Sequence, residues 1–202
     1  MSEDSRPTQS LIYHPYNILL TLTLGAVVAL FIALTGSYIY SRIQNPSPPI
    51  QLPGLFYINT LILLASSATM IWAKKSYRRD QTSKYQLALL VTIILSAVFM
   101  ISQYVAWKEL FSNEIFISYS NLASYFYLIS AVHFMHVMAG VPFLILFLRS
   151  AYLQMKEPVS VLVYFSDPEK RLKLRLLTIY WHFLDALWIY LVVFFWINNL
   201  IK

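Results

Sequence analysis

The chain has 202 residues, of which 58% are apolar and only 12% charged, and its mean hydropathy is +0.60. Soluble domains carry about 25% charged residues, so this composition indicates a membrane protein. The net charge is +6, but the basic residues lie between apolar blocks, which favours membrane-flanking charge over nucleic-acid binding. Cysteine is absent, which excludes disulfides, iron–sulfur clusters and thiolate-bound metals.

Five apolar blocks are each long enough to cross a bilayer, which requires about 20 residues. The expected spans are residues 18–40, 53–73, 86–107, 121–148 and 177–200. None of them shows the polar face of a soluble amphipathic helix. The sequence therefore predicts an all-α integral membrane protein, a single domain over residues 1–202 built as a bundle of five transmembrane helices. The acidic N-terminus does not predict a cleavable signal.

Lysine and arginine predict the orientation of the chain. Twelve of the 15 lie in the N-terminal tail and in the second and fourth connections, leaving only Arg42, Lys108 and Lys202 for the other side. Because positive residues gather on the cytoplasmic side, we expect a cytoplasmic N-terminus and an outer C-terminus. We place the protein in the bacterial inner (plasma) membrane as a multi-pass protein.

The first span carries a small residue or threonine at every fourth position, namely Thr21, Gly25, Ala29, Ala33 and Ser37. Such a row lies on one helix face and allows a neighbouring backbone to approach closely, so it predicts helix packing. The connection that follows contains Pro46, Pro48, Pro49 and Pro53, which predict a stiff, non-helical link.

Polar and aromatic residues mark the second and third spans. Asn59 is the costliest polar group of the second span to bury, and we expect it to face protein. The third span ends with Gln103, Trp107 and Glu109; Glu109 is either solvated at the outer rim or caps a helix or binds a partner. We assign four tryptophans to the membrane interface or to lipid contact: Trp72, Trp107, Trp181 and Trp188.

The fourth and fifth spans hold His133, His136, His182 and Asp185. The members of each pair are three residues apart and so lie on one face. A charged carboxylate at mid-membrane costs at least about 2.5 kcal/mol, so Asp185 needs a partner or a proton, and the three histidines are the candidates. Three interpretations compete: haem ligation as in a membrane cytochrome b, a proton or ion relay in a transporter, and polar contacts that join the helices.

Several segments together resemble one known family. Residues 180–188, YWHFLDALW, are similar to the YWHFxDxxW motif of subunit III of haem–copper terminal oxidases (cytochrome c and quinol oxidases). Residues 133–140, HFMHVMAG, resemble its HxxHVxxG helix, and residues 59–73, NTLILLASSATMIWA, resemble its NTxxLLxSSxxxxWA helix. Gln103 and Glu109 match the spacing of its QxxxxxE segment. The chain looks like the five-helix bacterial form.

The resemblance implies a non-catalytic subunit that binds no haem, copper or other metal and has no catalytic residue of its own. It implies that haem and copper belong to subunit I, that subunits I and II are partners, and that structural phospholipid is held between helix groups. A respiratory supercomplex is a further implied partner. The polar residues His133, His136, His182, Asp185, Asn59, Gln103 and Glu109 then serve as structural contacts between helices.

The chain also departs from the family pattern. Longer members carry a glutamate in the helix before the NT…WA segment, whereas residues 18–40 contain no acid, and an acid inside the QxxxxxE stretch is replaced by Ala106. Related accessory subunits of nitric-oxide reductase systems share much of the pattern and remain an alternative, as does a haem-b-binding cytochrome subunit. The electron donor of the complex, cytochrome c, quinol or another respiratory complex, stays open.

Overall fold

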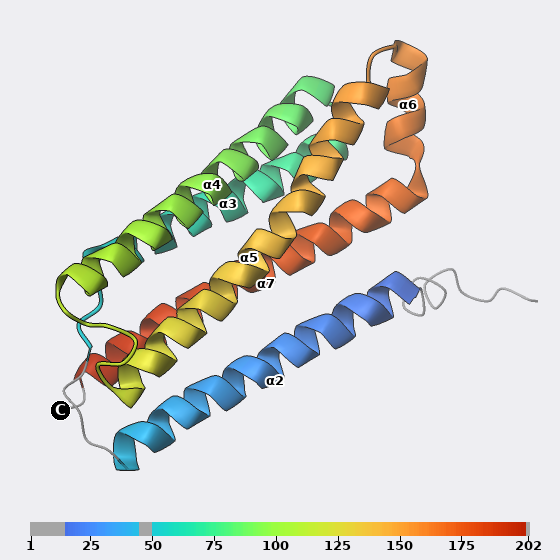
Figure 1. The fold of residues 1–202 in the computed structure, drawn as a ribbon. Helices are drawn as coiled ribbons and strands as arrows, with labels where there is room; N and C mark the ends of the chain where they lie inside the picture. The colour runs from blue at the N-terminus through green and yellow to red at the C-terminus, as the bar shows by residue number, and fades with distance from the viewer. Residues whose placement is uncertain (1–14, 45–49, 201–202) are drawn as a thin grey trace, which may run out of the picture.

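The computed structural model describes residues 15–44 and 50–200. The helices in this part are α2 (Pro15–Gln44), α3 (Gly54–Tyr77), α4 (Thr82–Ser112), α5 (Asn121–Gln154), α6 (Pro158–Ser166) and α7 (Pro168–Leu200), arranged as Figure 1 shows. Pro53 precedes α3 as its N-cap residue. The acidic N-terminus and the link prolines Pro46, Pro48 and Pro49 lie outside the described residues.

The five long helices confirm the five predicted spans. Each is long and apolar enough to cross a membrane, and no strand occurs in residues 15–44 or 50–200. Most helices extend beyond the predicted spans, because the helix continues through charged end residues such as Lys74, Lys75 and Lys84.

The fourth connection contains a short helix, α6 (Pro158–Ser166). Pro158 and Pro168 both stand at the first position of a helix, where the missing N–H costs nothing. The short helix α6 was not predicted. Its Tyr164 and Phe165 are buried against the ends of the bundle, and the Tyr77 hydroxyl donates a hydrogen bond to the Tyr164 carbonyl at 3.1 Å.

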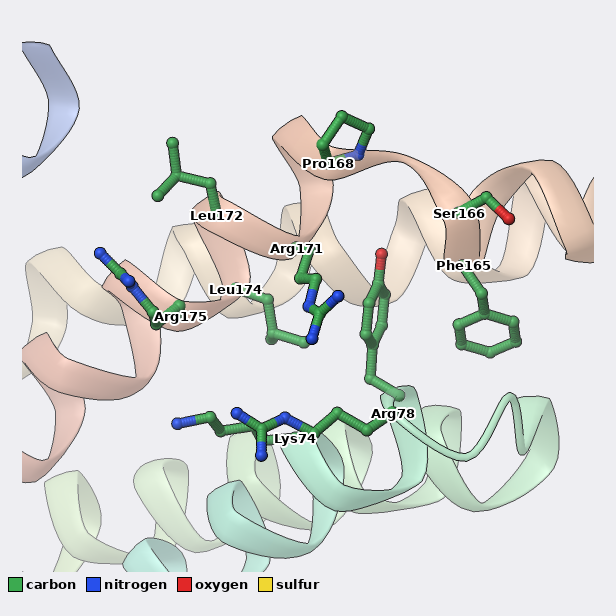
Figure 2. A pocket seen from close by; sticks show the side chains of 10 residues that line it. Lys74, Arg78, Phe165, Ser166, Pro168, Arg171, Leu172, Leu174 and Arg175 are labelled. Carbon is green, nitrogen blue, oxygen red and sulfur yellow. The ribbon is translucent and has the colours of Figure 1, made fainter. Parts of the chain in front are cut away.

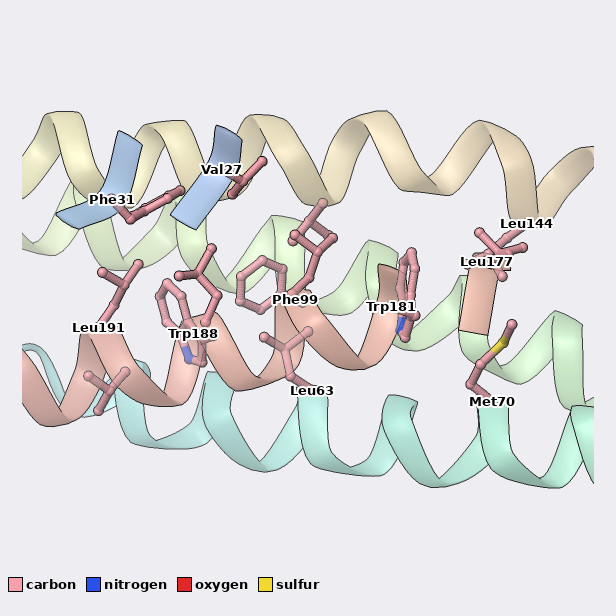
Figure 3. Close-up of a cluster of buried hydrophobic side chains, with 14 of the residues drawn as sticks. Val27, Phe31, Leu63, Met70, Phe99, Leu144, Leu177, Trp181, Trp188 and Leu191 are labelled. Carbon is pink, nitrogen blue, oxygen red and sulfur yellow. The ribbon is translucent and has the colours of Figure 1, made fainter. Parts of the chain in front are cut away.

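The helices pack around α5 and α7. The antiparallel pair α3 and α4 lies on one side, where α3 contacts α7 and α4 contacts α5, and α2 lies on the other side against α5 and α7 (Figure 1). Large aromatic and aliphatic side chains fill the space between them, with Trp181 and Trp188 of α7 pointing into the middle of the bundle (Figure 3). The outer surfaces carry many exposed leucines, isoleucines and valines, as a helix surface facing lipid requires.

The row of small residues on α2 does not pack against the other described helices. Thr21, Gly25, Ala29 and Ala33 are exposed and Ser37 is partly buried. The buried face of α2 is instead formed by larger residues, chiefly Val27, Phe31, Thr35 and Tyr38. The expectation of packing through this row is therefore wrong within this chain, because side-chain bulk rather than close backbone approach holds α2 to α5 and α7.

Candidate functional site

Trp188 joins four helices at one level of the bundle. Its ring, on α7, stacks on Phe56 of α3 at 5.3 Å between centroids and meets Phe99 of α4 edge-on at 5.3 Å. The His133 ring of α5 lies 5.0 Å away. The indole N–H donates to the Thr60 hydroxyl of α3 at 3.2 Å. A single side chain thus contacts α3, α4 and α5 from α7.

Trp181 makes a similar junction two turns along α7. Its indole N–H donates to the Ser66 hydroxyl of α3 at 3.0 Å. On the other side it lies against Gly140 of α5, where an added Cβ would come within 2.9 Å of the Trp181 ring and 3.1 Å of the Tyr180 ring. Tyr180 itself donates from its hydroxyl to the His136 carbonyl at 2.9 Å. Gly140 therefore sets how closely α5 and α7 approach.

These contacts correct the assignment of two tryptophans to the membrane interface. Trp181 and Trp188 are each 1% exposed, because hydroxyls on α3 accept from their N–H groups and let the large rings enter the core. Trp72 is 36% exposed on the outside of α3. Trp107 is partly buried, donates to the Ser130 hydroxyl of α5 at 3.1 Å, and packs against Phe134.

Asn59 and Gln103 meet between α3 and α4. Both side chains are fully buried, and the Asn59 amide nitrogen donates to the Gln103 amide oxygen at 2.9 Å. The remaining amide oxygen of Asn59 and amide nitrogen of Gln103 have no hydrogen-bond partner among the described residues. The two polar residues that stood 44 positions apart in the sequence thus join two neighbouring helices.

The two histidines of α5 contact different neighbours. The His133 ring is fully buried against Phe99 and Trp188, and neither ring nitrogen has a hydrogen-bond partner within residues 15–44 and 50–200. The His136 ring faces Phe31 of α2, and its Nδ1–H donates to the Val132 carbonyl of the preceding turn at 2.7 Å. Although three positions apart, the two imidazoles do not converge on one ligand.

Asp185 lies beside His182 and Ser67, at the contact of α7 with α3. The Ser67 hydroxyl and His182 Nδ1 are hydrogen-bonded at 2.6 Å, and the Ser67 hydroxyl also reaches the Asp185 carboxyl. His182 Nδ1 is 3.9 Å from Asp185 Oδ2, within ion-pair range when the imidazole is protonated. Of the three candidate histidines, the structure places His182 next to this acid.

The end of the bundle where α4 ends and α5 begins holds Glu109 and a contact that the sequence did not suggest. Glu109 is exposed and lines a cavity of about 420 Å³ with residues from the start of α3 and from the α4–α5 connection. Across the bundle, the Arg42 guanidinium of α2 donates to the Asn198 side-chain oxygen of α7 at 3.0 Å. Thr35 and Tyr190 also share a hydrogen bond between α2 and α7, at 3.0 Å. Only knowledge of how the helices face each other would have identified these partners.

Hydrogen bonds join polar groups of different helices, Asn59 with Gln103 and Ser67 with His182, whereas His136 is bonded within α5 and His133 contacts its neighbours through its ring alone among the described residues. His133 packs against Phe99 and Trp188 and forms no hydrogen bond to His182 or Asp185 within the described residues, which does not favour a continuous proton relay. Within the described ranges, no three His, Asp or Glu side chains are grouped as a metal site would need. The arrangement favours interhelical contact over the ligand and relay interpretations.

Comparisons with known proteins all indicate the same family. The family model described as cytochrome c oxidase subunit III matches residues 20–199. The chain is 30% identical over 149 residues to cytochrome c oxidase subunit 3 of Papio hamadryas, and equally to that of Mus musculus; each alignment covers 74% of this chain and 51% of the relative. The subunit 3 of Heterololigo bleekeri is 24% identical over 206 residues, covering 91% of this chain and 73% of the relative. The chain thus spans about half the length of the first two relatives.

Proposed function

This chain belongs to the cytochrome c oxidase subunit III family, and we propose that it is a non-catalytic core subunit of a proton-pumping haem–copper respiratory oxidase. In this role it stabilises subunit I and holds structural phospholipid while subunit I reduces dioxygen. The haem and copper belong to subunit I, and subunits I and II are its partners. The complex resides in the bacterial inner membrane, where a respiratory supercomplex is a further partner.

This proposal rests mainly on the hydrogen bonds that buried polar side chains form between helices. Asn59 is engaged with Gln103 of α4, and Trp181 and Trp188 with hydroxyls of α3. Polar groups that stabilise helix packing are expected in a subunit that supports its partners structurally and carries out no reaction itself. Among the described residues neither ring nitrogen of His133 has a hydrogen-bond partner, and the ring is enclosed by Phe99 and Trp188, so it faces packed side chains and not a space that fits a porphyrin.

The surface of the bundle supports a role in a larger assembly or in lipid binding. Exposed apolar side chains cover the outside of all five long helices. The small-residue row of α2 lies on that surface and offers a close approach for a helix of another subunit. Subunits I and II on one part of this surface and lipid on the rest would account for both observations.

Purification of the tagged full-length chain from membranes of its own host tests the proposal. We expect it to co-purify with stoichiometric amounts of a haem- and copper-containing subunit, and the complex to reduce dioxygen. A chain that purifies without any redox-active partner under mild detergent conditions, while remaining folded by circular dichroism, would contradict the proposal. If the co-purified complex reduces nitric oxide in place of dioxygen, the chain is instead an accessory subunit of a related nitric-oxide reductase system.

A further inference from the structure

A basic cavity lies between α3 and α7 at the end of the bundle that the charge distribution predicts to be cytoplasmic. It has a volume of about 550 Å³. Its cationic wall consists of Lys74 and Arg78 from α3 and Arg171 and Arg175 from α7. In Figure 2 the Arg171 guanidinium reaches into the space between the two helices, and the Arg78 side chain runs along α3 beside Lys74. Among the described residues, no carboxylate lines this basic cavity.

Within the described residues, the four cations of the basic cavity lack the ion pairs that the neighbouring lysines of α7 form. Lys170 pairs with Asp167 at 3.9 Å and Lys173 with Glu169 at 2.7 Å. Over residues 15–44 and 50–200, none of the four forms a salt bridge, although Arg175 donates to the Asn17 side-chain oxygen at 2.9 Å. Asp80 lines an adjoining cavity together with Arg78 and Arg171.

Several like charges around one cavity repel each other, and an anion between them relieves that repulsion. Arginine and lysine contributed by two sides of one cavity suit a phosphate group, whose oxygens accept several charge-assisted hydrogen bonds at once. The cavity therefore has the chemistry of an anion site.

The surroundings of the basic cavity are apolar in the direction of the membrane. Ile71 lies one turn below Lys74 on α3, and Ile179 one turn below Arg175 on α7; these side chains are 55% and 41% exposed. The cavity wall itself includes Phe165, Leu172 and Leu174. An acidic peptide entering here would leave backbone N–H and C=O groups without partners, whereas the glycerol and acyl carbons of a lipid would not.

We infer that the basic cavity binds the phosphate of an anionic phospholipid, whose acyl chains lie along the apolar surface of α3 and α7. Membrane leaflets on the cytoplasmic side attract basic residues through such lipids. The inference rests on the proposed function, because it assigns a place and a head-group charge to lipid that the subunit holds.

Two double variants of α3 test the site. Lys74→Gln with Arg78→Gln removes the two cations of α3 that line the cavity. Lys75→Gln with Arg79→Gln removes two exposed cations from the same helix end that do not line it, and is the matched control. Phosphatidylglycerol and phosphatidylcholine are titrated into the purified complex, and bound lipid is counted by native mass spectrometry.

We expect the unmodified complex to bind phosphatidylglycerol more tightly than phosphatidylcholine. The cavity variant should weaken phosphatidylglycerol binding by at least about tenfold and the control by less than about threefold, with phosphatidylcholine binding unchanged in both. Equal losses in the two variants, or equal binding of the two lipids to the unmodified complex, would overturn the inference. Arg171→Gln removes a cavity cation from α7 and serves if the double variant does not accumulate.

Two further outcomes identify a different occupant. Displacement of phosphatidylglycerol by inorganic phosphate at similar concentration would assign the cavity to free phosphate. Loss of an acidic partner polypeptide from the cavity variant, but not from the control, would assign it to a protein contact. Each result overturns the lipid inference, while co-purification of the unmodified chain with its redox-active partner decides the proposed function separately.

Discussion

Replacing Trp188 with alanine is expected to lower the free energy of unfolding of the chain by about 3 kcal/mol, with a correspondingly lower melting temperature in detergent. Large-to-small changes of buried tryptophan cost about 3–5 kcal/mol in soluble proteins. The lower end applies because lipid, unlike water, gives little hydrophobic drive between helices, so the loss comes from packing and from one hydrogen bond. Trp188 supplies packing to α3, α4 and α5 together. Circular dichroism during denaturant titration measures the change.

Two variants separate the causes of the Trp188 effect. Trp188→Phe keeps most of the ring but loses the hydrogen bond to Thr60, and should cost about 1 kcal/mol. Trp196→Ala removes a tryptophan that is 46% exposed near the end of the same helix, and should change the unfolding free energy by less than about 0.5 kcal/mol. If Trp196→Ala and Trp188→Ala are equally harmful, the four-helix junction is not the source of stability.

Gly140→Ala is expected to destabilise the contact between α5 and α7 by about 1–3 kcal/mol. The added methyl would lie 2.9 Å from the Trp181 ring and 3.1 Å from the Tyr180 ring. Neither ring can move away freely, because Trp181 is hydrogen-bonded to Ser66 and Tyr180 to the His136 carbonyl. The same denaturant titration, together with the yield of folded chain from membranes, measures the loss.

Gly36→Ala provides the matched control on α2. A Cβ at Gly36 meets nothing within 4 Å, and alanine favours helix more than glycine by about 1 kcal/mol. The control should therefore leave stability unchanged or raise it, so that the two glycine-to-alanine changes have opposite signs. A neutral result at Gly140 would show that α5 and α7 can separate at no cost, contrary to the packing described above.

The number of membrane-length helices could be predicted from the sequence because membrane thickness sets the length of an apolar span. Residues 121–148, for example, required only their composition to be recognised, and α5 covers them. The short helix α6 could not be found in this way. A proline interrupts a helix when it lies inside it but favours a helix when it is its first residue, and the sequence does not say which position Pro158 takes.

The side-chain contacts were harder to predict because they depend on how each helix is rotated and how far it is shifted along its neighbours. Tryptophan in a membrane protein is typical of the interface, yet Trp181 and Trp188 are buried because Ser66 and Thr60 happen to lie opposite their N–H groups. The same applies to the different surroundings of His133 and His136 on one helix. Asn59 and Gln103 could be singled out by their cost of burial, but their hydrogen bond to each other could not.

The central claim is that His133, His136, His182 and Asp185 join helices and hold no redox centre. Its most direct test is the visible absorption spectrum and the iron and copper content of this chain expressed and purified without other subunits. We predict a folded, helical protein with no Soret band and with far less than one metal ion per chain. One haem or one copper ion bound per chain, lost on replacing His133, His136 or His182, would contradict the account.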